Sequence, residues 1–236
     1  MTGLRRVLVT GVGRRIGIGA AVAVALRDDG WDVVTCGHRA YDARMPWGAD
    51  DEVLADIDGD FADPKEPLRI LEAAGAEGPL SALVMCHSES VDSGILDTTV
   101  AAWDRHFDVN ARAVWLLVKG FATQFPGPAG AGRIAAFTSD HVALNLPYGA
   151  SKGALERIII GGASELASVG ITANVINPGA TETGWMDDRT RTSVLQRNLQ
   201  PRVGTPADAA NLIRFVLSEQ GGWVNGQILY SDGGLH

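Results

Sequence analysis

A glycine-rich turn near the start of the chain limits the folds it can adopt. The apolar run Arg6–Thr10 leads into Gly11-Val12-Gly13-Arg14-Arg15-Ile16-Gly17-Ile18-Gly19, and helical periodicity follows over Ala20–Arg27. Glycines at such a turn let the backbone approach a pyrophosphate, which the unpaired amides of the helix N-terminus stabilise. The order of strand, glycine turn and helix therefore predicts a dinucleotide site, although a tight turn without a ligand would use the same residues.

The rest of the chain alternates short apolar strands with helices. About seven strands separated mostly by helices predict an α/β, Rossmann-type fold: a doubly wound parallel sheet with helices on both faces. At 236 residues the chain suits one core, so we expect a single domain over residues 1–236 that also holds the catalytic site. Further strands are expected at Trp31–Cys36, Val53–Ile57, Leu80–Cys86, Ile134–Phe137, Ile171–Ile176 and Gln227–Tyr230, and further helices at Pro67–Ala74, Thr98–Phe125 (interrupted near Phe107), Tyr148–Val169 and Ala207–Ser218.

Charge and composition argue against several classes of protein. The formal charge of −8 leaves no positive surplus to neutralise a nucleic acid. No run approaches the ~20 apolar residues of a membrane span, and the N-terminus passes directly into the first strand, so we expect neither a membrane anchor nor a signal peptide. Cys36 and Cys86 fit buried thiols in the cytoplasm. The five histidines, 38, 87, 106, 141 and 236, show no metal-ligand spacing, and we expect no metal.

The end of the second predicted strand indicates which dinucleotide binds. A carboxylate there would hold an unphosphorylated ribose, but Gly37, His38 and Arg39 occupy the position. Together with Arg14 and Arg15, Arg39 offers cationic partners for a 2′-phosphate, which favours NADP(H). Solvated surface arginines would give the same sequence, so NAD(H) stays possible. Asp60 and Phe61, after the third predicted strand, are candidates for contact with the adenine, although an acidic surface turn would look the same.

The best candidates for catalysis are Tyr148 and Lys152. Residues four apart lie on one face of a helix, which brings the ammonium near the phenol. A nearby positive charge favours the phenolate and so lowers the pKa of the tyrosine toward the range useful for acid/base catalysis. A buried tyrosine beside a surface lysine is the alternative interpretation.

Several motifs together make a wider resemblance plain. They are Thr10-Gly11 with Gly17-Ile18-Gly19, Asp108-Val109-Asn110, Phe137-Thr138-Ser139, Tyr148 with Lys152, Asn177-Pro178-Gly179 with Thr183, and Gly226-Gln227 with Asp232-Gly233-Gly234. The chain resembles, from end to end, the short-chain dehydrogenase/reductase family in its single-domain, ketoreductase-like branch. Two stretches suggest a bacterial subgroup with a longer glycine loop: Ala40-Tyr41-Asp42 with Met45-Pro46-Trp47-Gly48, and Thr183-Gly184-Trp185-Met186.

The resemblance implies a role for each catalytic candidate. Tyr148 would be the general acid in carbonyl reduction and the base in alcohol oxidation, and Lys152 would lower its pKa and hold the nicotinamide ribose. Ser139 would hydrogen-bond the substrate oxygen, where negative charge grows. Asn110 would position a water connecting Lys152 to solvent.

The resemblance also implies the partners of the chain. These are a small carbonyl or alcohol substrate and further copies of the chain in a dimer or tetramer. The nicotinamide would be held at Pro178, Gly179 and Thr183, and the phosphates at Gly11, Gly13, Gly17 and Ile18.

Two departures from the family pattern bear on these roles. Met85-Cys86-His87-Ser88 replaces the family's usual Asn-Asn-Ala-Gly. This replacement bears on the affinity of the chain for its cofactor. The loop between Ser139 and Tyr148 is shorter than usual, so Thr138 could supply the hydroxyl instead.

Three functions remain after the sequence analysis. The first is an NADP-dependent oxidoreductase that interconverts a ketone and a secondary alcohol, such as a 3-oxoacyl thioester or another secondary-metabolite carbonyl. The second is a non-catalytic dinucleotide-binding sensor or regulator, and the third is a dehydratase or isomerase that uses Tyr148 without net redox change.

Overall fold

Seven parallel strands form one sheet in the order β3-β2-β1-β4-β5-β6-β7. The structure, a computed structural model, describes residues 5–127, 131–141 and 143–235, so His236 lies outside it. The strand order runs outward in both directions from the neighbours β1 and β4, and the predicted doubly wound parallel sheet is thereby confirmed. The strands are β1 (Arg6–Thr10), β2 (Asp32–Gly37), β3 (Ile57–Asp58), β4 (Leu80–Met85), β5 (Gly132–Phe137), β6 (Ile171–Asn177) and β7 (Ile228–Tyr230).

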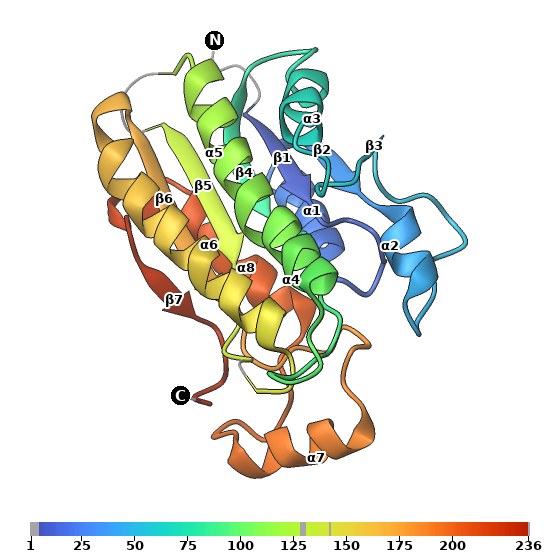
Figure 1. The fold of residues 1–236 in the computed structure, drawn as a ribbon. Coiled ribbons are helices and arrows are strands. Elements are labelled where there is room, and N and C mark those ends of the chain that lie inside the picture. The colour runs from blue at the N-terminus through green and yellow to red at the C-terminus, as the bar shows by residue number, and fades with distance from the viewer. Residues whose placement is uncertain (1–4, 128–130, 142, 236) are drawn as a thin grey trace.

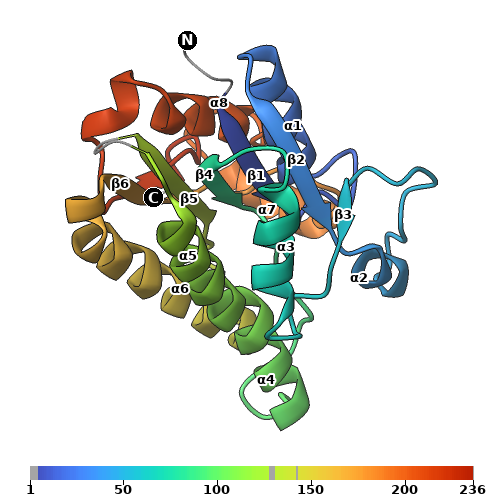
Figure 2. The same cartoon turned by 90° about the horizontal axis from the view of Figure 1, so that it is seen from above.

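Helices cover both faces of the sheet (Figures 1 and 2). Helices α1 (Ile18–Asp28) and α8 (Pro206–Leu217) pack together on one face and enclose a core that includes Val22 and Ile213. The opposite face carries α3 (Glu66–Ala74), α4 (Val100–Phe107), α5 (Ala113–Gln124) and α6 (Leu146–Glu165), over a second core centred on residues such as Leu117 and Ile159. Within the described chain no helix has both the length and the apolar composition of a membrane span.

The helix predicted over Thr98–Phe125 is interrupted where the sequence indicated. Helix α4 ends at Phe107, a π-helical turn spans Asp108–Arg112, and α5 continues from Ala113. A π-helical turn displaces the following side chains from the regular helical spacing, and such turns are frequent at functional sites. Here it carries the fully buried Asn110.

Two helices were not predicted from the sequence, and one predicted strand is mostly absent. Helix α2 (Arg39–Arg44) has only six residues, and α7 (Asp188–Arg197) buries none of its side chains. Without an apolar stripe neither shows the helical periodicity on which the prediction depended. The strand expected at Val53–Ile57 was wrong over most of its length, because only Ile57 and Asp58 pair with β2. The remaining irregular helices are short 3-10 turns at Ala167–Val169 and Gln220–Trp223.

The glycine turn is fixed by the packing of β1 against β4. Gly11 has φ +77°, and a Cβ at this position would lie 2.4 Å from the carbonyl carbon of Cys86, just beyond β4. No side chain fits there without moving the backbone. The requirement for glycine at this position therefore comes from the fold as well as from any ligand.

Alanine substitutions at Gly11 and Gly30 separate the effect of close packing from the effect of backbone strain. Gly30 has a similar φ of +78° but nothing within 4 Å of a Cβ. Both variants suffer backbone strain, and we expect Gly11→Ala to lose at least about 2 kcal/mol more in the free energy of unfolding, because it also overpacks a buried site. Urea unfolding followed by circular dichroism measures the difference. Equal losses in the two variants would contradict the packing argument.

Candidate active site

A single cleft of about 870 Å³ runs along the carboxyl edge of the sheet. Loops that follow β1, β2, β3, β4, β5 and β6 all contribute to it, because parallel strands end at the same edge. Most of the predicted site residues line this cleft: Gly11, Gly13, Arg14, Gly17, Ile18, Asp60, Phe61, Ser139, Tyr148, Lys152, Pro178, Gly179 and Thr183. Three others, Arg15, Arg39 and Asn110, do not line it.

Tyr148 and Lys152 lie on adjacent turns of α6 and both face the cleft. The Lys152 ammonium lies 5.7 Å from the centre of the Tyr148 ring and donates a hydrogen bond of 2.8 Å to the carbonyl of Phe137, the last residue of β5. Lys152 is only 2% exposed, and its burial lowers the pKa of the ammonium to about 8. The group can thus exchange a proton near physiological pH.

Two serine hydroxyls act on Tyr148. Burial raises the pKa of the phenol, whereas hydrogen bonds with Ser139 and Ser88 lower it. The net rise is opposite to the lowering predicted from the spacing of Tyr148 and Lys152, because desolvation of the phenol outweighs the favourable contacts. Ser139 thus lies within hydrogen-bonding distance of Tyr148 despite the short loop. Thr138 does not replace it, since its hydroxyl donates a hydrogen bond of 2.6 Å to Glu156.

Asn110 braces the cleft from behind. Its Oδ1 accepts hydrogen bonds from the Ser88 hydroxyl and the Glu89 amide, and its Nδ2 donates to the Glu89 carbonyl and the Ser151 hydroxyl. These four bonds use the full capacity of the amide. The side chain therefore has no atom left to hold the water that the family resemblance implied, and it instead ties the loop after β4 to α6.

The glycine turn provides a cradle for phosphates. Gly17 caps the N-terminus of α1, and the first amides of this 11-residue helix have no partner within the helix. A Cβ on Gly13 would lie 2.1 Å from the Asp42 carboxylate, so a larger residue there would displace that carboxylate. Close backbone and unpaired amides are what a pyrophosphate needs, and this part of the cleft fits a dinucleotide.

Arg14 is engaged by the protein itself rather than left open for a 2′-phosphate. Its guanidinium donates a hydrogen bond of 2.7 Å to the Thr183 carbonyl, lies 3.5 Å from the Asp42 carboxylate and stacks 4.7 Å from the centre of the Trp47 ring. Trp47 in turn stacks on Trp185, with ring centres 5.1 Å apart. These five residues, the Arg14 cluster, connect the glycine turn with the loop after β6.

A carboxylate that the sequence analysis did not identify also lines the cleft beside the glycine turn. Asp42, from the unpredicted α2, lines the cleft beside Gly13. Burial raises the pKa of this carboxyl, while the Trp47 hydrogen bond and Arg14 oppose the rise. Asp42 is paired with Arg14, so its charge is largely compensated.

The other two predicted arginines differ in their surroundings. Arg15 is exposed, and its guanidinium pairs with Glu52 at 2.5 Å. Arg39 is exposed at the start of α2, and within the described residues its side chain makes no hydrogen bond or ion pair. Of the three arginines, Arg39 has the guanidinium most available for a phosphate.

Asp60 and Phe61 line the cleft next to the charged residues Glu89 and Arg105. Arg105 donates two hydrogen bonds to the Asp60 carboxylate, at 2.9 and 3.1 Å, and also contacts Glu89, which is 2% exposed. Phe61 is buried, with its ring 4.2 Å from that of His87. The Asp60 carboxylate is thus committed to Arg105, and the buried face of Phe61 packs on His87.

His87 serves packing rather than proton transfer. Its Nδ1 lies 2.6 Å from the Thr10 hydroxyl and its Nε2 lies 3.2 Å from the Val109 carbonyl, so the ring links β1 to the π-helical turn. The pKa of the imidazole is lowered to about 3. Burial has the largest effect, and the nearby positive charge of Lys152 lowers the pKa further. The ring is therefore neutral at physiological pH.

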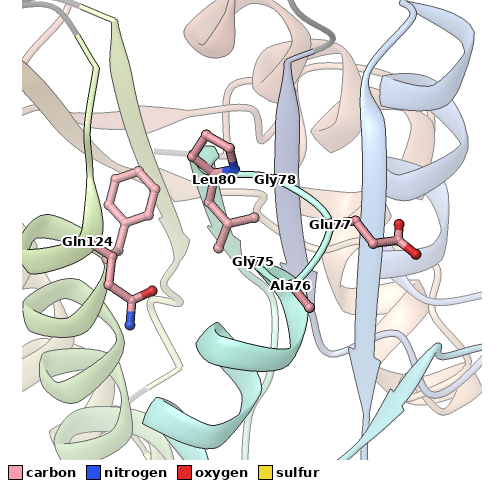
Figure 3. A pocket seen from close by; sticks show the side chains of 8 residues that line it. Gly75, Ala76, Glu77, Gly78, Leu80 and Gln124 are labelled. Carbon is pink, nitrogen blue, oxygen red and sulfur yellow. The ribbon is translucent and has the colours of Figure 1, made fainter.

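Away from the cleft, one further hollow lies at the opposite edge of the sheet (Figure 3). It has a volume of about 470 Å³ and is formed by the turn between α3 and β4 together with α5. Its only carboxylate, Glu77, turns away from Gln124 and hydrogen-bonds to Arg6. Over residues 5–127, 131–141 and 143–235, no group of three or more His, Cys, Asp or Glu side chains could hold a metal ion.

Comparisons with known sequences place the chain among oxidoreductases. The family model described as Enoyl-(Acyl carrier protein) reductase matches residues 11–236. "Short-chain dehydrogenase/reductase FrzI" from Cladobotryum sp is 32% identical, over 97% of this chain and 94% of the relative. "NADPH-dependent aldehyde reductase-like protein, chloroplastic" from Arabidopsis thaliana is 31% identical, over 98% and 93%. "Uncharacterized oxidoreductase YjdA" from Bacillus subtilis is 36% identical, but the match spans 66% of this chain and 64% of that protein.

Solved structures agree with the sequence comparison. A short-chain dehydrogenase from Burkholderia cenocepacia J2315 in complex with NADP superposes with a TM-score of 0.84 at 29% identity, covering 98% of this chain and 97% of the other. A blue fluorescent protein from a metagenomic library, in complex with NADPH, superposes with a TM-score of 0.85 at 28% identity and the same coverage.

Because the ammonium of Lys152 is buried, we predict that the free energy of unfolding depends on pH. Its pKa falls from 10.5 to about 8 on folding, so the unfolded chain binds more protons between these pH values. The free energy of unfolding of the wild type, relative to Lys152→Met, should therefore rise with pH across this window and stay constant below it. Urea unfolding at a series of pH values tests this, with the exposed Lys119→Met as the control. A difference that does not change with pH would contradict the burial of a charged Lys152.

Proposed function

Because the chain belongs to the short-chain dehydrogenase/reductase family, we propose that it is an NADP(H)-dependent oxidoreductase interconverting a ketone and a secondary alcohol. The observation that carries the proposal is the convergence of Ser139, Tyr148 and Lys152 in the cleft that also contains the glycine turn. The candidate substrates are 3-oxoacyl thioesters and other secondary-metabolite carbonyls.

Binding of the dinucleotide would use the two ends of the cleft. Gly11, Gly13, Gly17 and Ile18 would hold the pyrophosphate at the N-terminus of α1. At the other end, Pro178, Gly179 and Thr183 would hold the nicotinamide. When bound, NADPH supplies the hydride.

A side chain of the protein would transfer the proton. The phenol of Tyr148 would donate its proton to the carbonyl oxygen of the substrate, and the Ser139 hydroxyl would donate a hydrogen bond to that oxygen as its negative charge grows. In the site without substrate, contacts with the hydroxyls of Ser139 and Ser88 lower the pKa of Tyr148. Lys152 adds its positive charge beside the ring. Asn110 would act as a positioning residue, since its amide joins Ser88 to α6.

Preference for NADP(H) is proposed to depend chiefly on Arg39. Solved relatives bound to NADP and NADPH, and a relative named for its dependence on NADPH, support the choice of cofactor. Arg14 and Arg15 have partners within the protein, whereas the guanidinium of Arg39 has none within the described residues. Asp60 and Phe61 would border the adenine at the same end.

Further copies of the chain are proposed as partners. Val100, Trp103 and Trp115 expose 77%, 37% and 49% of their surfaces on α4 and α5. Apolar side chains of this size, gathered on adjoining helices, favour a homo-oligomer. Both cysteines are free thiols, consistent with a site of action in the cytoplasm.

Fluorescence titration with NADPH and NADH tests the cofactor assignment. We expect NADPH to bind more tightly, and Arg39→Asp to weaken NADPH binding by about tenfold or more while changing NADH binding little, because it replaces a charge-assisted contact with repulsion. Arg15→Asp is the matched control and should have the smaller effect, since Arg15 is paired with Glu52. Equal affinity of the wild type for both dinucleotides would contradict the NADP(H) assignment, and no binding would exclude the enzyme altogether.

Tyr148→Phe tests the proposed reaction. The variant should bind NADPH like the wild type but lose turnover of carbonyl substrates by about 10²- to 10⁴-fold, the usual contribution of a general acid. Loss of NADPH absorbance, matched by formation of alcohol, measures the turnover. Tight cofactor binding by a wild type that turns over no carbonyl compound would instead support a sensor or regulator.

A further inference from the structure

Asn145 is a buried side chain in the cleft with an unused hydrogen-bonding atom. It is 2% exposed and lines the cleft three residues before Tyr148. Its Nδ2 donates a hydrogen bond of 3.0 Å to the Ser90 hydroxyl, but its Oδ1 has no partner among the described residues. A buried amide oxygen without a partner is unfavourable and therefore rare in folded proteins.

The position of Asn145 makes this arrangement more unusual. The residue is the N-cap of α6, where an asparagine ordinarily accepts a hydrogen bond from an amide of the first helical turn. Its side chain makes no such bond. The side chain has turned to Ser90 instead, which leaves the helix N-terminus without its usual cap.

The backbone on both sides holds Asn145 in this orientation. Leu144 has φ +64°, a strained value for a non-glycine residue, and its side chain is 80% exposed. On the other side, the Leu146 amide donates to the Ser93 carbonyl at 2.9 Å, and the Asn145 carbonyl accepts from the Gly149 amide at 3.0 Å. Strain of this kind persists where the surrounding structure imposes it, often at a site for a ligand.

Ser90 complements Asn145. It is also buried, and it lines the same cleft. Its Oγ accepts from Asn145, while its hydroxyl proton goes to no acceptor within the part of the chain that the structure describes. The pair thus offers one acceptor, Asn145 Oδ1, and one donor, the Ser90 hydroxyl. A ligand hydroxyl group, which both donates and accepts, matches this pair.

We propose that Asn145 and Ser90 form a subsite for a hydroxyl group of the substrate close to the reacting carbonyl, so that the substrate is a hydroxyketone. This inference rests on the proposed function, because it places the reacting carbonyl at Tyr148. The polar side chains of Asp92, His141 and Arg197 also line the cleft, so a hydroxylated substrate would meet further hydrogen-bonding groups there.

Acetoin and butanone, which differ by one hydroxyl group, are suitable probes. In the wild type with NADPH, kcat/KM should be higher for acetoin. Asn145→Leu, which keeps the branched shape but removes the amide, should lower kcat/KM for acetoin by about tenfold, the effect of losing one hydrogen bond in a buried site, and change that for butanone by less than about twofold. Ser90→Ala should act in the same direction, and Asn145→Asp, which retains acceptor oxygens, should keep part of the preference. An equal loss for both ketones in Asn145→Leu would overturn the proposal.

Thermal unfolding gives a second, independent measurement. If Asn145 serves a ligand, Asn145→Leu in a Ser90→Ala background should melt at the temperature of Ser90→Ala or above it, because the bond between Asn145 and Ser90 is absent from both proteins and an unpaired buried oxygen is removed. A clearly lower melting temperature would show a structural role and overturn the subsite.

The same measurement separates this proposal from the proposed function. If the wild type with NADP⁺ is stabilised by acetoin but not by butanone, and Asn145→Leu loses that stabilisation, the subsite stands even where no turnover is seen. If acetoin is neither reduced nor stabilising, while NADPH binds and another ketone is reduced, the hydroxyl subsite is refuted and the oxidoreductase is retained.

Discussion

The parallel register of the sheet is the constraint on which the site depends. Because all seven strands run in one direction, the loops after β1, β4, β5 and β6 leave the sheet at the same edge. The close contact of Gly11 with the backbone after β4 brings the first of these loops against the second. Phe137, at the end of β5, then supplies the carbonyl that holds Lys152. The catalytic candidates are thus positioned by backbone that the core already fixes, and little of their arrangement depends on mobile side chains.

Two partly buried groups of charges in the cleft are paired before any ligand is considered. Arg14 is shared by Asp42, Trp47 and the Thr183 carbonyl, and Glu89 is shared by Arg44 and Arg105. Burying such charges costs free energy unless they are paired and hydrogen-bonded, which explains why each has several partners. The Arg14 cluster has a further consequence. Since it links the glycine turn to the loop after β6, the two segments proposed to hold opposite ends of the dinucleotide are connected through protein contacts.

The sequence predicted the parts of the molecule that depend on local pattern. Six of the seven strands, the long helices and the break near Phe107 follow from periodicity and from the positions of glycine, and Tyr148 with Lys152 follows from helical spacing. Contacts between distant segments did not follow. Asp42 reaches Gly13 from a helix too short to show a pattern, and the partners of Arg14 lie as far away as Thr183. The pKa of Tyr148 was predicted in the wrong direction because burial, which spacing does not reveal, has the largest effect.

The two buried asparagines of the site show how hydrogen bonding separates structural from ligand-binding roles. Asn110 and Asn145 are both almost fully buried and both lie near Tyr148 in the fold. Asn110 makes all four hydrogen bonds available to its amide, all with protein, so it has no capacity for anything that enters the cleft. Asn145 makes one, and its Oδ1 has no partner among the described residues. A side chain that serves only folding would gain from a partner for that oxygen. Its absence is therefore more simply explained by a partner that arrives with the substrate than by any requirement of the fold.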